Sequence, residues 1–185
     1  VVADISNQAD ALGVFEFDLQ GGELLLAADK LFAVIKAIKP ERFYLYLTTN
    51  GYFLDEAMAK RLAESGVSRV SVSIDSCDEK VHDDFRGCPG AHKRAIEALK
   101  HVQNAGMSPY LNITVGHYNV NSPDLEKLCQ YSKDQGYTTL LNVAVPSGRW
   151  QNMSEVMVDS RDIAHLIELR KKYKNILRDI WNPFD

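Results

Sequence analysis

Clustered cysteines are missing from this sequence. Its 185 residues include three cysteines, Cys77, Cys88 and Cys129, separated by wide and unequal intervals. An odd number of scattered cysteines is typical of reduced thiols rather than of a disulfide framework. The three form no CxxC or CxxxCxxC segment, so they provide neither a zinc motif nor an iron–sulfur motif. We therefore expect structural cysteines in a cytoplasmic protein.

A strong charge excess and a long apolar run are also absent. The formal net charge of −4 argues against a nucleic-acid or membrane-surface partner. No apolar stretch approaches the roughly 18 residues that a membrane-spanning helix needs, and no segment resembles a signal peptide. The composition does not shift along the chain, so residues 1–185 are expected to form a single domain. Because the chain begins at Val1 rather than at Met, we expect its natural N-terminus to be absent.

Short β-type segments alternate with helical ones at intervals of roughly 30 residues, as in right-handed βαβ units. The expected strands are Val14–Gln20, Phe43–Thr49, Val70–Asp75, Tyr110–Gly116 and Thr139–Val145. Capping residues and glycines predict helices from Asp55 to Gly66, from Gly90 to Gly106 and from Ser122 to Gly136, and a last helix capped by Ser160. The alternation indicates an α/β fold with a parallel sheet.

Polar and apolar residues alternate within several of these strands. In one of them, Asn112 and Thr114 stand between Leu111, Ile113 and Val115. Strands that are buried on both faces usually show continuous apolar runs, so a polar face here indicates a wet or ligand-lined side. The predicted fold is a partial (βα)-barrel, an open curved parallel sheet of about five strands with helices on its outer face. The alternative is a sheet with one solvent-exposed face.

The outer edge of the first expected strand, Val14–Gln20, has no partner in this sequence. An unprotected edge invites aggregation, and residues 1–11 resemble the end of a helix that leads into the strand. We therefore expect a preceding strand that this sequence does not contain.

Four polar motifs follow the strands in order. Gly21-Gly22-Glu23 comes directly after the first strand. Its glycines permit a close approach to a ligand and dihedral angles closed to other residues, and its carboxylate can accept a dehydrated ammonium group. The other motifs are Leu47-Thr48-Thr49-Asn50-Gly51, Val72-Ser73-Ile74-Asp75-Ser76 and the loop His82-Asp83-Asp84-Phe85-Arg86-Gly87. Barrels and open α/β sheets bind ligands at this end of their strands.

In this order and spacing the motifs resemble those of the radical SAM superfamily over roughly residues 10–150. The resemblance implies an enzyme in which a reduced [4Fe-4S] cluster passes one electron to S-adenosylmethionine (SAM). The products are methionine and a 5′-deoxyadenosyl radical, which takes a hydrogen atom from the substrate. The implied partners are a one-electron donor protein and an unidentified substrate, with a peptide or protein as a candidate.

Two departures from the family pattern stand out. The family's CxxxCxxC cluster loop would lie before Val1, so this chain alone is expected to hold no cluster and to be inactive. Leu24 stands where the family usually has a proline after its GGE motif.

By matching position, the resemblance implies that Gly21, Gly22 and Glu23 receive the SAM amino group. It implies that Ser73 and Arg86 bind the methionine carboxylate. Weaker candidates for contacts with SAM or substrate are Thr48, Asn50, Asp75, Asn112 and Thr114, and Val143 and Val145 lie where the family's sixth strand often lines the adenine. No catalytic residue and no metal ligand is assigned.

Each assignment has a plainer alternative. Asn50 and Gly51 could form a simple turn, Arg86 could pair with Asp83 or Asp84 at the surface, and Glu23 could cap a helix that begins near Ala27. His82 and its acidic neighbours are not expected to bind a metal, because three adjacent loop residues rarely converge on one ion. His117 is interpreted as a surface histidine. For the whole chain, the alternatives are a non-catalytic degenerate barrel that acts as a binding module and an unrelated partial-barrel enzyme.

Overall fold

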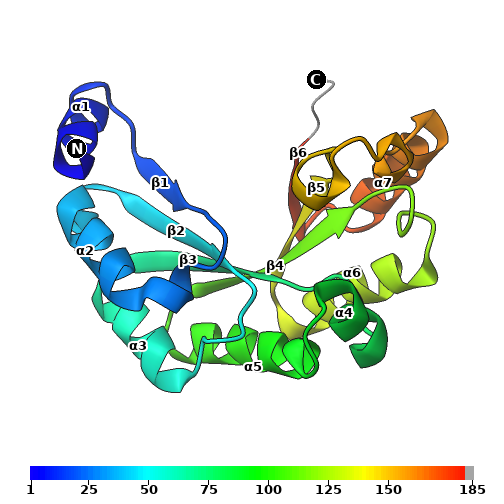
Figure 1. Ribbon diagram of the computed structural model, residues 1–185, viewed down its shortest axis with the longest axis horizontal. Coiled ribbons are helices and arrows are strands. Elements are labelled where there is room, and N and C mark those ends of the chain that lie inside the picture. Colours follow the sequence, from blue (N-terminus) through cyan, green and yellow to red (C-terminus); the bar gives the residue numbers. More distant parts are fainter. Residues whose placement is uncertain (182–185) are drawn as a thin grey trace. The chain divides into compact units, whose positions relative to one another are not determined.

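The structure is a computed structural model that describes residues 1–181. The chain divides into two compact units, and its α-helices and β-strands are labelled in Figure 1. The first unit contains Val1–Val72 and Lys93–Pro109, and the second contains Ser73–His92 and the chain from Tyr110 onward. The expectation of a single domain over residues 1–185 stays a prediction.

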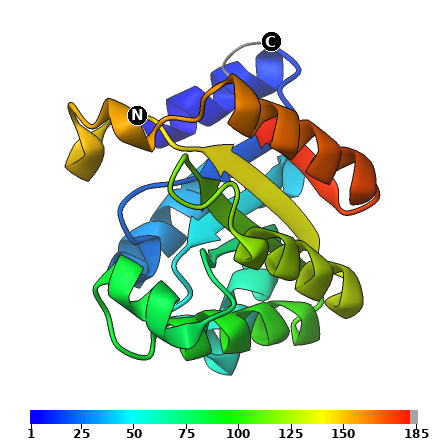
Figure 2. The ribbon, with the colours of Figure 1, turned by 90° about the vertical axis from the view of Figure 1, so that its right-hand side faces the viewer.

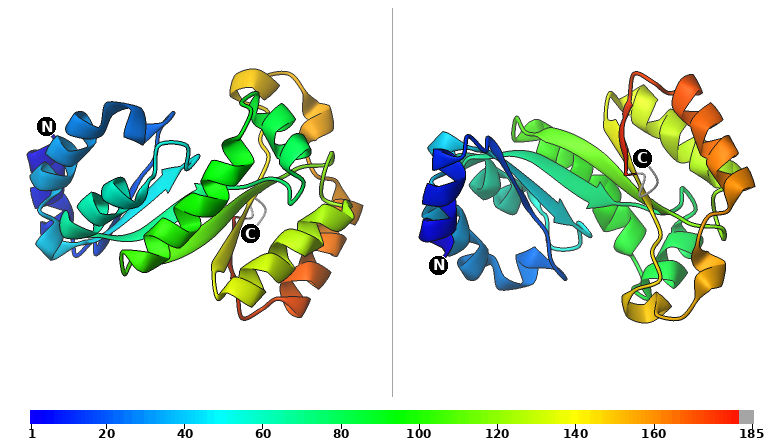
Figure 3. Two further views of the ribbon diagram at one scale, coloured as in Figure 1. Left: turned by 90° about the horizontal axis from the view of Figure 1, so that it is seen from below. Right: turned by 90° about the horizontal axis from the view of Figure 1, so that it is seen from above.

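The first unit is built on three parallel strands. They are β1 (Glu16–Leu19), β2 (Tyr44–Thr49) and β3 (Val67–Ser73), and β2 pairs with both of the others. Its helices are α1 (Val2–Ala11), α2 (Ala28–Ile38), α3 (Glu56–Glu64) and most of α5 (Ala91–Asn104), with short 3-10 turns η1 (Leu24–Ala27) and η2 (Pro40–Arg42). Figure 3 shows α1 lying against α2, where the Ser6 hydroxyl donates to the Ile38 carbonyl at 2.6 Å.

Leucine side chains of β2 pack against the helices of the first unit. Leu45 and Leu47 are fully buried, and Leu31 and Ile35 of α2 are buried at the spacing of one helical face. Tyr46 and Thr48, on the other side of β2, are only partly buried. The second face of β2 is therefore less buried than the first.

The second unit contains the other three strands. They are β4 (Ser108–Val115, whose first two residues belong to the first unit), β5 (Thr138–Val143) and β6 (Leu177–Trp181), and β5 pairs in parallel with both of the others. Its helices are α4 (Glu79–Arg86), α6 (Pro123–Gln135) and α7 (Ser160–Lys172), with short 3-10 turns η3 (Gly148–Trp150) and η4 (Ser154–Val156). Figure 2 shows α6 and α7 next to β5, and the Tyr173 hydroxyl after α7 donates to Glu126 of α6 at 3.3 Å.

The predicted fold class is confirmed: the fold is an α/β partial barrel with the strand order β1-β2-β3-β4-β5-β6. The expected number of about five strands is corrected to six. The missed strand, β6, has the sequence LRDIW, in which charged residues interrupt the apolar pattern of a strand. The bounds of the other five strands differ from the expected ones by at most three residues.

Alternating burial is confirmed along β4. Leu111, Ile113 and Val115 are buried, whereas Asn112 and Thr114 are only partly buried. The pattern does not extend through β3, because Ser71 is 2% exposed. Small hydroxyl side chains can be accommodated inside a core, so Ser71 does not mark a wet face.

Most expected helix ends are confirmed by capping contacts. Asp55 accepts from the Met58 N–H at 2.8 Å, and Ser122 accepts from the Asp124 N–H at 3.2 Å. Gly136 ends α6 in the left-handed conformation, with φ of 72°. Between residues 1 and 181, no helix combines the length and the apolar character required to span a membrane.

Two local expectations were wrong. The last helix is capped by Asp159 rather than Ser160, because the Asp159 carboxylate accepts from the N–H groups of Arg161 and Asp162. The segment expected to be a loop around His82 is helix α4. The Asp78 side chain caps this helix, and Gly87 ends it.

Gly51 occupies a position that excludes any larger residue. Its φ is +79°, and an added Cβ would lie 2.9 Å from Val72 Cγ1 and 3.0 Å from Ala95 Cα. We expect Gly51→Ala to lower the free energy of unfolding by about 2–4 kcal/mol, from backbone strain and overpacking together. Gly106 is a matched control because it has a φ of +81° and nothing within 4 Å of an added Cβ. Gly106→Ala should therefore cost only about 1 kcal/mol in denaturant unfolding. Equal costs would contradict the close packing at Gly51.

Candidate functional site

The candidate residues from the sequence fall into two groups, one in each compact unit. The first unit holds Gly21, Gly22, Glu23, Thr48 and Asn50, and the second holds Ser73, Asp75, Arg86, Asn112, Thr114, Val143 and Val145.

The Glu23 carboxylate organises the group in the first unit. Its Oε1 accepts from the Thr49 hydroxyl at 2.8 Å and from the Leu25 N–H at 3.1 Å, and its Oε2 accepts from the Asn50 N–H at 2.8 Å. Glu23 therefore does cap a helical segment, but this segment is the 3-10 turn η1 rather than a helix that begins near Ala27. The Thr49 hydroxyl and the Asn50 N–H hold the carboxylate at the C-terminal end of β2. The carboxylate oxygens keep lone pairs for another donor.

Gly21 and Gly22 both adopt ordinary backbone angles. Neither glycine has a positive φ, so the expectation of dihedral angles closed to other residues was wrong. An added Cβ on Gly22 would meet nothing within 4 Å, and one on Gly21 would meet only the Leu24 side chain. A cavity of about 400 Å³ borders Gly22, Glu23 and Leu24. No protein neighbour requires glycine at Gly22, which leaves open space there for a ligand.

Asn50 and Gly51 form a turn after β2. The Asn50 side chain accepts from the Tyr52 N–H at 2.8 Å, and Gly51 supplies the positive φ. The turn interpretation is thus confirmed, although the Asn50 backbone N–H also binds Glu23. Thr49, which the sequence did not single out, contacts Glu23, whereas Thr48 is partly exposed on the other side of the strand.

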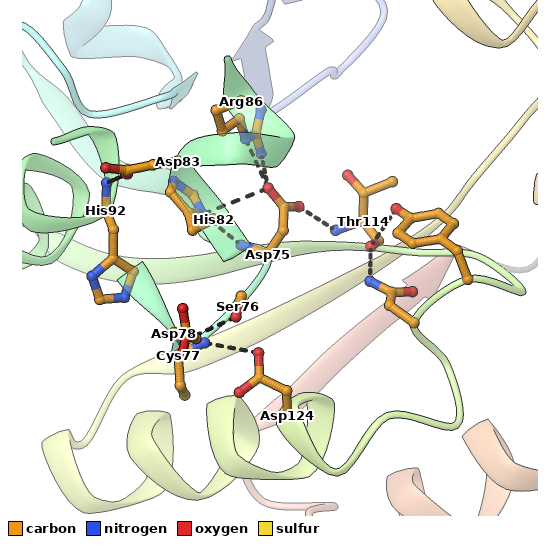
Figure 4. Close-up of polar contacts among 12 residues, drawn as sticks. Asp75, Ser76, Cys77, Asp78, His82, Asp83, Arg86, His92, Thr114 and Asp124 are labelled. Atoms are coloured by element: carbon orange, nitrogen blue, oxygen red, sulfur yellow. Dashed lines mark hydrogen bonds and ion pairs between the residues drawn. The ribbon is translucent and has the colours of Figure 1, made fainter. Parts of the chain in front are cut away.

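A buried carboxylate organises the group in the second unit (Figure 4). The Asp75 side chain is 4% exposed, and its Oδ2 accepts from Arg86 Nε at 2.7 Å and lies 2.6 Å from Arg86 Nη2. Its Oδ1 accepts from the Thr114 N–H of β4 at 3.4 Å. Burial raises the pKa of Asp75, while the Arg86 charge and the Thr114 N–H oppose that rise. The Asp75–Arg86 pair therefore joins the end of β3, the end of α4 and β4.

Asp75 was not among the expected partners of Arg86. Asp83 instead accepts from the His92 N–H at 2.8 Å, and Asp84 pairs with Lys80. The alternative of a surface pair between Arg86 and Asp83 or Asp84 was therefore wrong. Both Arg86 contacts to Asp75 use Nε and Nη2, which leaves Nη1 for another acceptor.

His82, on α4, also contacts Asp75. Its ring is 1% exposed, and its Nδ1 accepts from the Asp75 N–H at 3.2 Å. Burial, followed by the positive charge of Arg86 and the neighbouring His92, lowers the pKa of His82 to about 4. His82 is therefore a neutral hydrogen-bond acceptor near neutral pH, and Figure 4 shows its contact with Asp75.

The remaining candidates of the second unit have separate surroundings. Ser73 is the last residue of β3, and Asn112 accepts from the Asn142 side chain on the neighbouring strand. Val145 lies two residues beyond β5 and is 43% exposed. Val143 is the last residue of β5 and is partly buried.

Three aromatic residues that the sequence did not single out lie close together, and one of them, Phe85, directly precedes Arg86 in α4. Phe85, Tyr118 and Trp150 have ring centroids 5.7–6.2 Å apart, and we call them the aromatic cluster. A cavity of about 290 Å³ is lined by Phe85, Arg86, Thr114, Ser147 and Trp150. Phe85 is an aromatic residue within the otherwise polar segment His82–Gly87, and this was the signal in the sequence that could have pointed to the aromatic cluster.

His117 is an exposed surface histidine, as expected, and it also contacts a buried carboxylate. Its Nδ1 lies 2.7 Å from Oδ2 of the buried Asp162, and the Asn121 side chain donates to Oδ1 of the same carboxylate at 2.9 Å. This hydrogen bond, followed by the Asp162 charge, raises the pKa of His117. Within residues 1–181, His117, Asp159 and Asp162 are the group whose ligand atoms could approach one metal ion. Their mutual hydrogen bonds already account for the arrangement.

The three cysteines are free; Cys77 and Cys88 lie in the segments before and after α4, and Cys129 lies on α6. Burial raises the pKa of Cys77 to about 11 and that of Cys129 to about 12, so both are protonated thiols near neutral pH. Iron–sulfur clusters are ligated by several neighbouring thiolates. These residues therefore do not fit such a cluster.

Comparison with protein families gives a match to the family model described as the Radical SAM superfamily, over residues 1–131. The chain is 31% identical over 168 residues to an AdoMet-dependent heme synthase of Methanosarcina barkeri (strain Fusaro / DSM 804), covering 89% of this chain and 47% of that protein. It is 24% identical to a PqqA peptide cyclase of Granulibacter bethesdensis, covering 94% and 47%. The chain thus spans about half the length of the curated relatives it matches.

Solved structures share the fold. The crystal structure of Streptococcus suis SuiB has a TM-score of 0.73 at 17% identity, covering 94% of this chain and 39% of that one. Native anSMEcpe with bound AdoMet has a TM-score of 0.68 at 17% identity, covering 94% and 50%.

The low pKa of His82 predicts a pH-dependent loss of stability. Between its ordinary value of 6.5 and about 4, the unfolded chain binds a proton at His82 that the folded chain does not. The free energy of unfolding is therefore not reduced by His82 above this window, and it falls as the pH falls through the window. We expect wild type to lose about 2 kcal/mol more than His82→Asn between about pH 7.5 and about pH 5. Asn keeps an acceptor for the Asp75 N–H but does not titrate.

The measurement is denaturant unfolding at both pH values. His165→Asn is the control, because His165 is exposed on α7, and this variant should lose as much stability as wild type. Equal losses in wild type and His82→Asn would refute the prediction.

Proposed function

The chain belongs to the radical SAM superfamily, and on this basis we propose that it supplies SAM-binding residues of a radical SAM enzyme. The observation that carries the proposal is the Glu23 carboxylate, held by three donors next to the open space at Gly22. A fixed carboxylate in a partly dry setting is the acceptor that an α-ammonium group requires.

In the first unit, we assign Gly21, Gly22 and Glu23 to the amino group of SAM. The hydrogen bonds from Thr49, Leu25 and Asn50 orient the carboxylate before the ligand arrives, which lowers the cost of ordering it. Open space at Gly22 admits the ligand close to the backbone. Thr48 and Asn50 remain weaker candidates for contacts with SAM or substrate.

In the second unit, we assign Arg86 to the methionine carboxylate of SAM. Asp75 holds the guanidinium through Nε and Nη2, so that Nη1 can donate to a ligand at the cavity that Arg86 lines. A guanidinium suits a carboxylate through charge-assisted hydrogen bonds. Ser73 and Asn112 stay candidates for polar contacts, and Val145 stays a candidate for the adenine.

The reductive cleavage of SAM needs an electron from a [4Fe-4S] cluster, which this chain's scattered thiols do not fit. The cysteines that ligate it would have to belong to a longer protein, in line with the partial coverage of the relatives. We propose that SAM, held by Glu23 and Arg86, would supply a radical able to take a hydrogen atom from the substrate, and that a one-electron donor protein serves as partner.

A peptide or protein is the substrate class that we favour. One similar structure is SuiB bound to the precursor peptide SuiA, and one relative is the PqqA peptide cyclase. Other relatives are AdoMet-dependent heme synthases, so the substrate assignment is tested separately from SAM binding.

Replacing Glu23 by Gln in the full-length protein tests the proposal. Gln removes the charge that faces the ammonium group, and we expect SAM to bind roughly 30- to 700-fold more weakly, a loss of about 2–4 kcal/mol. The measurement is a calorimetric titration of SAM against protein with its cluster reconstituted.

Glu41→Gln is the matched control, since Glu41 is exposed in η2 at the other end of β2. It should leave SAM affinity unchanged. Thermal unfolding of both variants separates a binding defect from a folding defect, because Glu23 also supports its own loop. Unchanged SAM affinity in a folded Glu23→Gln protein would leave Glu23 with a capping role alone.

A further inference from the structure

Three segments of the second unit bring the aromatic cluster together. Phe85 comes from the end of α4, Tyr118 from the segment after β4, and Trp150 from η3. The Phe85 and Tyr118 rings stack at 23° with centroids 5.7 Å apart, and Trp150 lies 6.2 and 5.8 Å from them. These separations fall in the range of favourable aromatic contacts.

The cluster is only partly covered by protein. Phe85 is 38% exposed and Tyr118 is 44% exposed, although large aromatic side chains gain most by burial. Phe85 and Trp150 line the cavity of about 290 Å³ together with Arg86. Pockets for whole drug-sized ligands begin at about this size, so the cavity suits one ring with its substituents.

The position of Tyr118 is set by its neighbours. An added Cβ on Gly116 would lie 2.6 Å from Tyr118 Cε1 and 2.5 Å from the Val156 carbonyl oxygen, so the turn needs glycine there. The Tyr118 hydroxyl donates to the Thr114 carbonyl at 3.2 Å. The ring is therefore held over the end of β4 with part of its surface uncovered.

We propose that Phe85, Tyr118 and Trp150 form a subsite that binds a planar, uncharged ring of the substrate by stacking. The proposal rests on the assignment of Arg86 to the SAM carboxylate, which leaves the aromatic faces beside it for the second reactant. An uncharged ring is favoured because the three aromatic side chains carry no charge, and because the remaining donor of Arg86 is assigned to the SAM carboxylate. Stacking also distinguishes a flat ring from a saturated one of similar size.

The test uses benzyl alcohol and cyclohexylmethanol, which differ in the flatness of the ring and share the hydroxymethyl group. The chain has two tryptophans, Trp150 and Trp181, whose indole N–H signals can be told apart in a ¹H–¹⁵N spectrum with a Trp181→Phe variant. We expect benzyl alcohol to shift the Trp150 signal in a saturable way and cyclohexylmethanol to bind roughly three- to tenfold more weakly.

Phe85→Leu should weaken benzyl alcohol binding by a similar factor, roughly three- to tenfold. Phe53→Leu is the matched control, because Phe53 is 43% exposed in the first unit and should leave binding unchanged. Thermal unfolding shows whether each variant is folded, and Tyr118→Leu replaces Phe85→Leu if that variant is not.

Equal binding of the two alcohols, or equal effects of Phe85→Leu and Phe53→Leu, would overturn the subsite. In the cluster-loaded full-length protein, the proposal predicts that saturating SAM leaves benzyl alcohol bound. Displacement by SAM would show that the rings take the adenine of SAM and would overturn the assignment to substrate. Failure of SAM to bind, with benzyl alcohol still bound, would contradict the proposed function and leave the ring-binding subsite in place.

Discussion

The buried carboxylate of Asp75 is the contact on which the arrangement of the second unit's candidate site depends. It accepts hydrogen bonds from Arg86 and from the Thr114 N–H, while its own N–H donates to His82. Removing one partner from a buried ion pair typically costs about 3–5 kcal/mol, so these groups hold one another in place. A ligand that approaches Arg86 therefore meets a guanidinium whose orientation is already set.

The Glu23 carboxylate organises the candidate site of the first unit, but the donors that hold it differ in kind from those of Asp75. Its three donors come from its own loop and from the end of β2, and none carries a formal charge. Asp75 is balanced by a cation of the protein, whereas Glu23 has no cationic hydrogen-bond partner within residues 1–181. This difference is the physical reason to assign a cationic ligand group to Glu23, whereas the carboxylate is assigned to Arg86 because Nη1 remains as a donor.

The segment from His82 to Gly87, expected to be a loop, lies in helix α4 and at its end. In a loop, Arg86 could have reached the cavity only if the segment folded back over the end of the strand. As a helix, it buries His82 on one side and holds Arg86 at its last position, next to the Gly87 that ends it. The spacing of four residues between His82 and Arg86 places both side chains on one helical face, toward Asp75. His82 is a neutral acceptor there near neutral pH.

Local signals in the sequence determined most of the fold. Asp55, Ser122 and Gly136 marked helix ends because a cap depends on only a few neighbouring residues. Alternation in β4 predicted one polar face because side chains of a strand alternate regardless of what packs on them. The order of the motifs likewise predicted the family to which the chain belongs.

Only the tertiary structure decided which groups meet. The pairing of Arg86 with Asp75, the contact of Thr49 rather than Thr48 with Glu23, and the aromatic cluster of Phe85, Tyr118 and Trp150 all join residues from different elements. Such contacts depend on how strands and helices pack, and no residue spacing along the chain encodes them. Strand β6 escaped prediction for a similar reason, since its pairing with β5, not an apolar pattern of its own, makes it a strand.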